Sequence, residues 1–101
     1  MPTKFQEAVY VLTQQIPKGK VVTYKEIVNA LGTAAYRGVG TVLKNNPDMP
    51  KTPCHRVINT NGDVGAYAGL GGTKRKIYLL RKEGVKITKG KIELAKFEFH
   101  F

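Results

Sequence analysis

Apolar residues recur at helical spacing over the first sixteen positions of the chain. Residues that repeat every three or four positions share one face of a helix. We therefore expect an amphipathic helix from Thr3 to Ile16, ended by Pro17, whose ring removes a backbone donor. The apolar positions of this face are Phe5, Ala8, Val9, Leu12 and Ile16.

A second helix is predicted behind a short β-like run, Val21-Val22. The sequence Thr23-Tyr24-Lys25-Glu26 has the form of a capping box, with Thr as the N-cap and Glu three positions later. Gly32 suits the left-handed position that commonly ends a helix. The residues expected to be buried are Ile27, Val28 and Leu31.

A third helix follows, and Thr33 can cap it. Its outer face begins with Tyr36 and Arg37 and carries Gly38 and Gly40. Two short helices joined by a tight glycine-containing turn are typical of a helix-turn-helix, although many all-helical cores contain the same pattern. The residues expected to face inward are Val39, Val42 and Leu43.

The second half of the chain alternates loops with short elements. Three prolines between residues 46 and 53 predict a stiff, extended loop. Residues 56–58 and 62–64 look like two strands of a hairpin about an Asn61-Gly62 turn, followed by a glycine-rich loop over residues 65–72.

The last predicted helix runs from Thr73 to Lys82, with Ile77 and Leu80 inward and Gly84 as its cap. Beyond it, apolar pairs on either side of residues 88–91 predict a terminal β-hairpin. These pairs are Val85 with Ile87 and Ile92 with Leu94.

Together the elements predict a mostly α fold with short β segments, a winged-helix-like helix-turn-helix domain. A chain of 101 residues suits one domain. We expect residues 1–84 to form its body and residues 85–101 to be a C-terminal extension of the same domain.

Charge narrows the class of partner. Seventeen Lys and Arg against seven Asp and Glu give a net charge of +10, which attracts polyanions. A basic surface can also serve solubility or a ribosomal or chaperone-like role, but beside a helix-turn-helix it favours nucleic-acid binding. Lys74, Arg75 and Lys76 are either phosphate contacts or an exposed helix face.

Other features of the sequence limit the expected compartment of the protein and the metal sites that it can form. No apolar stretch approaches the roughly 20 residues that cross a bilayer, and a single cysteine fits a reducing compartment. Cys54, His55 and His100 are the only thiol and imidazoles, too few for a four-ligand Cys/His zinc site. We therefore expect a cytoplasmic protein with no membrane partner and no metal.

Cys54 lies between Pro53 and the pair His55-Arg56. A lone cysteine is more often a small buried apolar residue than a nucleophile. Here a fixed backbone, an imidazole and a cation supply what a thiolate requires. In an extended chain the side chains of Cys54 and His55 point apart, which leaves both a direct contact and a relay through a water molecule open. The residues alone also leave open whether Cys54 is a nucleophile or a buried apolar residue.

The run Pro53-Cys54-His55-Arg56-Val57-Ile58 resembles the active-site signature of the O6-alkylguanine-DNA alkyltransferases. The resemblance covers about residues 5–84 and is to the C-terminal catalytic domain of that family only, since members often carry an N-terminal domain before it. Five further segments are similar to the family, in the right order: residues 19–24, 37–40, 45–47, 62–67 and 79–84.

The resemblance implies that an alkyl group moves from O6 of guanine in double-stranded DNA to Cys54, once per molecule and without a cofactor. His55 would take the thiol proton through a water, and Glu83 would orient His55. Asn46 would support the turn beside the site. We expect the protein to act as a monomer.

It also implies that the damaged nucleotide is extruded, because O6 of a stacked guanine cannot meet a thiolate in line. Arg37 would take the place of that nucleotide, and Tyr24 would aid its rotation. The small residues of the third helix would allow a close approach to the minor groove. The other residues implied to contact the base or the DNA are Pro53, Arg56, Val64, Gly65, Tyr67, Ala34, Ala35 and Gly38.

Two alternatives stay open. The first is a non-catalytic alkyltransferase-like protein, which binds the lesion and recruits excision repair. Such proteins resemble this chain in length but typically carry tryptophan where Cys54 stands. The second is an ordinary helix-turn-helix regulator, which would leave the run around Cys54 without a purpose.

Overall fold

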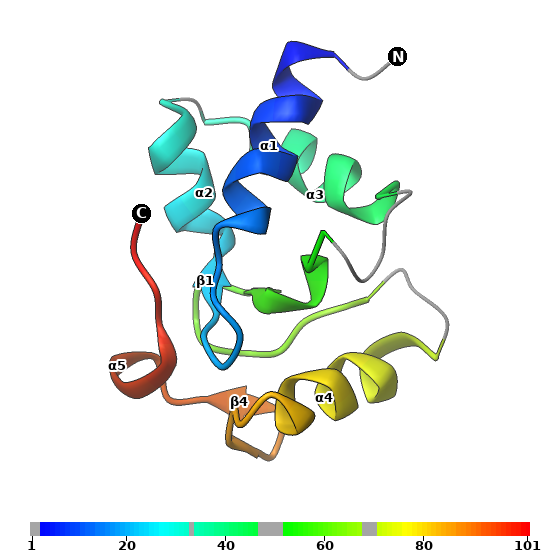
Figure 1. The fold of residues 1–101 in the computed structure, drawn as a ribbon, viewed down its shortest axis with the longest axis vertical. Coiled ribbons are helices and arrows are strands. Elements are labelled where there is room, and N and C mark those ends of the chain that lie inside the picture. Colours follow the sequence, from blue (N-terminus) through cyan, green and yellow to red (C-terminus); the bar gives the residue numbers. More distant parts are fainter. Residues whose placement is uncertain (1–2, 33, 47–51, 68–70) are drawn as a thin grey trace.

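The structure, a computed structural model, describes residues 3–32, 34–46, 52–67 and 71–101. Three helices lie together at one end of the molecule, and a fourth helix with a small hairpin lies at the other (Figure 1). The prediction of a mostly α fold with short β segments is confirmed. In chain order the elements are α1 (Lys4–Gln14), β1 (Val22–Thr23), α2 (Tyr24–Leu31), α3 (Tyr36–Lys44), the 3-10 turn η1 (Cys54–Arg56), β2 (Val57–Ile58), α4 (Gly72–Lys82), β3 (Ile87–Thr88), β4 (Lys91–Ile92) and α5 (Leu94–Phe97).

Local capping explains where the first two helices begin. Thr3 and Gln6 form a reciprocal capping box, in which Oγ1 of Thr3 accepts from the Gln6 amide at 3.1 Å. Thr23 caps α2 by accepting from the Glu26 amide at 3.2 Å. Gly32 follows α2 with a φ of 68°, the left-handed conformation that glycine adopts without a Cβ penalty. The predicted bounds of both helices are confirmed to within two residues.

The start of α3 differs from the prediction. Thr33 lies outside the described residues, and the helix begins at Tyr36 with Ala35 in the N-cap position, where no side-chain hydrogen bond is made. The inward face is as predicted, because Val39, Val42 and Leu43 are all buried. Helices α2 and α3 form the helix-turn-helix, and α1 packs against both.

The predicted hairpin between residues 56–58 and 62–64 is wrong. A tight turn does form, with the Gly62 amide donating to the Asn59 carbonyl at 3.0 Å. However, β2 pairs in parallel with β1, which sets Val57 opposite Val22, and Asp63 bridges to Lys91 instead. The buried apolar run of β2 therefore finds its partner far away in the sequence rather than across the nearest turn.

The core has two parts. One lies between α1, α2 and α3 and includes Cys54 at its edge. The other lies under α4 and contains residues of the C-terminal segment: its buried members are Val21, Ile58, Val64, Leu80, Val85, Ile87 and Ile92. None of the helices in the described ranges is long and apolar enough to span a membrane.

The C-terminal segment is tied to the body of the fold by backbone hydrogen bonds. The predicted hairpin is confirmed as β3 and β4, which pair antiparallel. Beyond α5, which the sequence did not predict, the Phe99 amide donates to the Val21 carbonyl at 2.8 Å. Val64 donates to the Gly90 carbonyl at 2.9 Å, so the hairpin also supports the segment that follows β2.

Candidate functional site

Cys54 opens the η1 turn and lines a pocket of about 310 Å³. Its side chain is buried, with 8% exposed, yet it belongs to the pocket wall rather than to the closed interior. Helices α2 and α3 and the segment after β2 supply the other walls. The lining residues are Tyr24, Gly40, Leu43, Lys44, Cys54, Ala66 and Tyr67.

The backbone at Cys54 is held by Thr52. The Thr52 carbonyl accepts from the Cys54 amide at 2.8 Å and from Nδ2 of Asn46 at 2.8 Å. The Thr52 hydroxyl accepts from Nε2 of Gln14 at 2.9 Å, which ties the turn to α1. Asn46 therefore lies beside the turn, where the resemblance puts it; the sequence did not single out Gln14 and Thr52.

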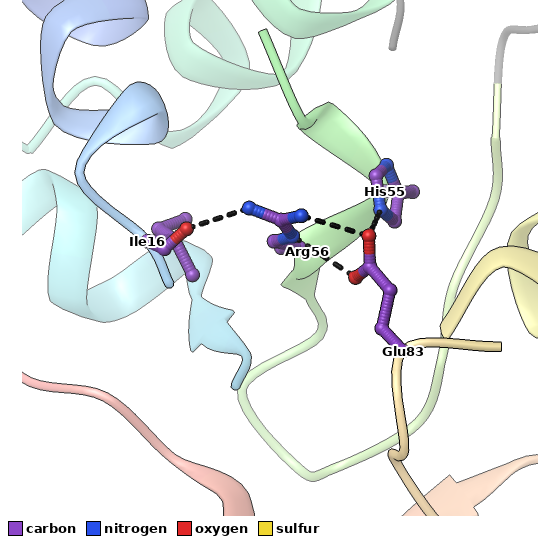
Figure 2. A network of polar contacts seen from close by, with 4 residues as sticks. All are labelled: Ile16, His55, Arg56 and Glu83. Carbon is purple, nitrogen blue, oxygen red and sulfur yellow. Dashed lines mark hydrogen bonds and ion pairs between the residues drawn. The ribbon is translucent and has the colours of Figure 1, made fainter. Parts of the chain in front are cut away.

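His55, Arg56 and Glu83 form a polar network behind the turn (Figure 2). Nε2 of His55 lies 3.0 Å from Oε2 of Glu83, and the imidazole is 2% exposed. A carboxylate accepts hydrogen bonds only, so this contact places the imidazole proton on Nε2. Nδ1 is buried with no hydrogen-bond partner in the described part of the chain. His55 thus presents an unused proton acceptor.

Arg56, which the resemblance implies contacts the base or the DNA, makes its hydrogen bonds within the protein. Its Nε and Nη2 donate to the two oxygens of Glu83 at 3.0 and 2.7 Å, and Nη1 donates to the Ile16 carbonyl at 2.8 Å (Figure 2). This two-pronged pair is the geometry that a guanidinium and a carboxylate favour. Arg56 therefore fixes the position of the Glu83 carboxylate and of the backbone just after α1.

The electrostatics favour a neutral imidazole beside a protonated thiol. Burial lowers the pKa of His55, and it outweighs the opposing effect of Glu83. Burial also raises the pKa of the Cys54 thiol, although a hydrogen bond from Asn46 and the charge of Lys76 act in the other direction. Burial alone would raise the pKa of Glu83, but hydrogen bonds from Arg56 and His55 hold it below its ordinary value. The thiol therefore needs a base to become a nucleophile.

Lys76 is the main residue of the site that sequence reasoning missed. It was expected to lie on an exposed face or against phosphate, but it is 1% exposed. Its Nζ donates to the Val57 carbonyl at 2.8 Å and to the Ala66 carbonyl at 3.1 Å. Burial lowers its pKa to about 8, against the opposing charge of Cys54. The spacing to buried Leu80, one helical turn on, was the available signal.

The expected DNA-contacting residues in α3 and just before it separate into two groups. Arg37 and Ala34 are exposed, and Ala35 is half-buried. Gly38 faces α1 instead: a Cβ there would lie 3.3 Å from the Phe5 ring. Gly38 is therefore small because the two helices approach each other at this point.

Of the segment after β2, which was expected to line the pocket over residues 64–67, Ala66 and Tyr67 lie among the lining residues and Val64 and Gly65 do not. The Val64 side chain is buried in the core, and its amide is bonded to Gly90, so it does not line the pocket. Gly65 has a φ of 79°, and a Cβ there would lie 2.9 Å from Oδ1 of Asn59. Tyr67 does line the pocket, and burial raises its pKa.

Two further expected site residues, Pro53 and Tyr24, also lie at this site. Pro53 is buried at the start of η1, next to Cys54. Tyr24 begins α2 on the pocket wall, and burial followed by the charge of Cys54 raises its pKa. Within the described ranges, no three His, Cys, Asp or Glu side chains lie together in a way that could hold a metal ion.

A helix-turn-helix with a cysteine-lined pocket beside its second helix places the chain in the helix-turn-helix class of DNA-binding folds. The family model for the 6-O-methylguanine DNA methyltransferase DNA-binding domain matches residues 4–85. The chain belongs to this family. The model describes a DNA-binding domain, so it does not match our narrower expectation of a C-terminal catalytic domain only.

Individual relatives and solved structures are consistent with this family assignment. A methylated-DNA–protein-cysteine methyltransferase of Saccharolobus solfataricus is 48% identical over 83 residues, 82% of this chain and 52% of the relative. Schizosaccharomyces pombe Atl1, in complex with damaged DNA containing O6-carboxymethylguanine, superposes with a TM-score of 0.86 at 31% identity over all of both chains. Mycobacterium tuberculosis OGT in complex with DNA gives a TM-score of 0.76 at 38% identity, over 82% of this chain and 51% of that one. The chain thus spans about half the length of the two methyltransferases.

Proposed function

We propose that the protein repairs double-stranded DNA by moving the alkyl group of an O6-alkylguanine onto Cys54. The observation that carries this proposal concerns two consecutive residues. Cys54 lines an open pocket, and the neighbouring His55 has Nδ1 unused while Glu83 holds Nε2. A nucleophile beside a base that is oriented by a third group is the arrangement of covalent catalysis.

The reaction balances without a cofactor. The thiol proton of Cys54 passes to Nδ1 of His55 through a bridging water, and the sulfur attacks the alkyl carbon. The bond between that carbon and O6 breaks, and the guanine takes up the proton as it leaves. Because the thioether is stable, each molecule acts once. The pocket provides the positioning on which such a displacement depends.

Access to the lesion requires extrusion of the nucleotide from the duplex. We propose that exposed Arg37 on α3 takes its place in the stack. Tyr24, on the pocket wall, would aid the rotation. The solved complexes of Atl1 and of the Mycobacterium tuberculosis protein with DNA support a DNA partner for this fold.

Several broader features belong to the same proposal. The DNA-binding domain would itself hold the transfer site, corresponding to the catalytic region of the longer relatives. Residues 1–84 and 85–101 would act as one domain, and one monomer would serve one lesion. The protein would work in the cytoplasm, on the DNA of the nucleoid.

A second candidate is a lesion-binding protein that performs no transfer. The observation in its favour is the structural similarity to Atl1, with a TM-score of 0.86 at 31% identity. The presence of a thiol at position 54 favours transfer. Both candidates share the same pocket and the same DNA face, so only the chemistry separates them.

Intact-mass spectrometry after incubation with DNA containing O6-methylguanine tests the proposal. We expect the protein to gain one methyl group, located on the peptide that contains Cys54. The matched variant Cys54→Ala should bind the lesion and gain no mass. An unshifted mass together with tight, lesion-specific binding would establish the second candidate instead.

A further inference from the structure

A second hollow adjoins the Cys54 pocket on the helix-turn-helix face. We call it the flank groove; its volume is about 480 Å³. Tyr24, Gly40 and Ala66 line both the flank groove and the Cys54 pocket, so the two hollows are continuous. The residues that line only the flank groove are Tyr36, Arg37, Asn59 and Thr60.

Tyr36 is unusual in this setting because its side chain is 47% exposed. It occupies the first position of α3, next to Arg37, and the first turn of that helix carries no acidic residue. The buried face of α3 is formed by Val39, Val42 and Leu43, and among the described residues Tyr36 belongs to neither part of the hydrophobic core. Its ring is available for a ligand.

The chemistry of the flank groove suits a nucleotide. An aromatic face stacks on any base, and a guanidinium neutralises phosphate. The amide of Asn59 and the hydroxyl of Thr60, both on exposed residues, can bond to sugar or phosphate oxygens. These groups converge at the mouth of the pocket that would take the extruded guanine.

We propose that the flank groove holds the nucleotide next to the extruded one on the same strand, with the Tyr36 ring stacked on its base. This inference rests on the proposed function, since it presumes that a guanine occupies the Cys54 pocket. Extrusion exposes one base face on each side of the gap; Tyr36 covers one of these faces, and Arg37, in the vacated position, lies against the other. Because adjacent nucleotides share one phosphate, a base in the Cys54 pocket delivers its neighbour to the continuous hollow.

Equilibrium binding in the Cys54→Ala background, which cannot transfer alkyl groups, tests the inference. The probes are duplexes with one O6-methylguanine whose same-strand neighbour, on the 5′ or the 3′ side, is either adenine or an abasic site. On one of these sides we expect at least about fivefold tighter binding with adenine, because stacking of one base on an aromatic side chain has about that effect or more. Tyr36→Ala should abolish this preference, and Tyr36→Phe should retain it.

Tyr78→Ala is the matched control, because Tyr78 is equally exposed, at 50%, but lies on α4. It should keep the preference for adenine. An undiminished preference in Tyr36→Ala, or a preference set only by bases of the opposite strand, would overturn the inference. Failure of the proposed transfer would appear separately, as an unshifted mass of the protein with Cys54 intact.

Discussion

Nε2 of His55 lies 3.0 Å from Oε2 of Glu83, although 28 positions separate the two residues in the chain. This contact decides which imidazole nitrogen carries the proton, and so which one can accept another. Glu83 in turn is held by Arg56 through both of its oxygens. The orientation of the His55 imidazole, the proposed base, therefore depends on Glu83 and, through Glu83, on Arg56.

Glu83→Gln should slow transfer and weaken the fold. The amide cannot act as an anion toward Arg56, which is left largely buried without its partner, at a cost of up to about 3 kcal/mol. Without a fixed imidazole, we expect the single-turnover rate to fall by about 100-fold. Urea denaturation and quenched-flow assays measure the two effects. Glu93→Gln changes an exposed carboxylate and should leave both unaltered; equal effects of the two substitutions would contradict this role of Glu83.

Transfer should tolerate mildly acidic conditions. The proposed base acts only when neutral, and burial lowers the pKa of His55 from its ordinary value of 6.5. The midpoint of the loss of transfer rate on acidification should therefore lie below pH 6.5. A midpoint above pH 6.5 would show that His55 is not the group that limits the rate.

Stability should fall over the same acidic range. A group whose pKa is lower in the folded state stabilises the fold above its unfolded pKa, and this stability is lost as the pH falls toward the folded value. For His55 the loss begins near pH 6.5, and for Glu83 it begins near pH 4.5. Urea midpoints measured against pH should show the first step in the wild type and not in His55→Gln.

Lys76→Met should make Cys54 less reactive. Removing a nearby cation takes away one of the effects that lower the pKa of the thiol. Because the chain has one cysteine, the thiolate can be followed directly by its ultraviolet absorbance. We expect the pKa of Cys54 to increase and alkylation by iodoacetamide at pH 8 to slow by several-fold. Lys74→Met removes an exposed cation from the same helix and is the control. It should change neither the pKa of Cys54 nor the rate of alkylation.

Gly65→Ala should destabilise the protein and damage the pocket. The new methyl group would meet Asn59, and the positive φ adds strain, so we expect a loss of about 2 kcal/mol or more. Gly32→Ala is the control, because its φ is also positive but the new Cβ would meet no atom within 4 Å among the described residues beyond its immediate surroundings in the chain. It should lose only about 1 kcal/mol and keep full affinity for lesion DNA, as measured by fluorescence polarisation.

Arg37→Ala should reduce transfer from duplex DNA far more than transfer from a free O6-alkylguanine base. The free base needs no extrusion, so a residue that fills the stack has no effect on it. Lys18→Ala removes an exposed cation in the turn after α1 and controls for the loss of charge. Equal losses on both substrates in Arg37→Ala would rule out the stack-filling role.

The features that the sequence determined by itself depend on residues that are close together along the chain. Thr3 and Thr23 mark helix starts because an N-cap bonds to an amide only three positions away. The spacing of Val39, Val42 and Leu43 predicts the buried face of α3 because a helix repeats every 3.6 residues. The resemblance carried by the run around Cys54 also depends only on local order.

The tertiary structure decided what depends on distant partners. Nothing local distinguishes β2 pairing with β1 from β2 pairing across the next turn, because both arrangements satisfy the same backbone groups. Lys76 carries the same charge as its exposed neighbours, and only the packing of α4 over β2 makes it a buried donor near Cys54. Arg56 likewise bonds inside the protein, because the Glu83 carboxylate and the Ile16 carbonyl just after α1 lie within hydrogen-bonding distance of its guanidinium. Such roles follow from which surfaces the folded chain encloses, and this is set by the packing of the whole chain.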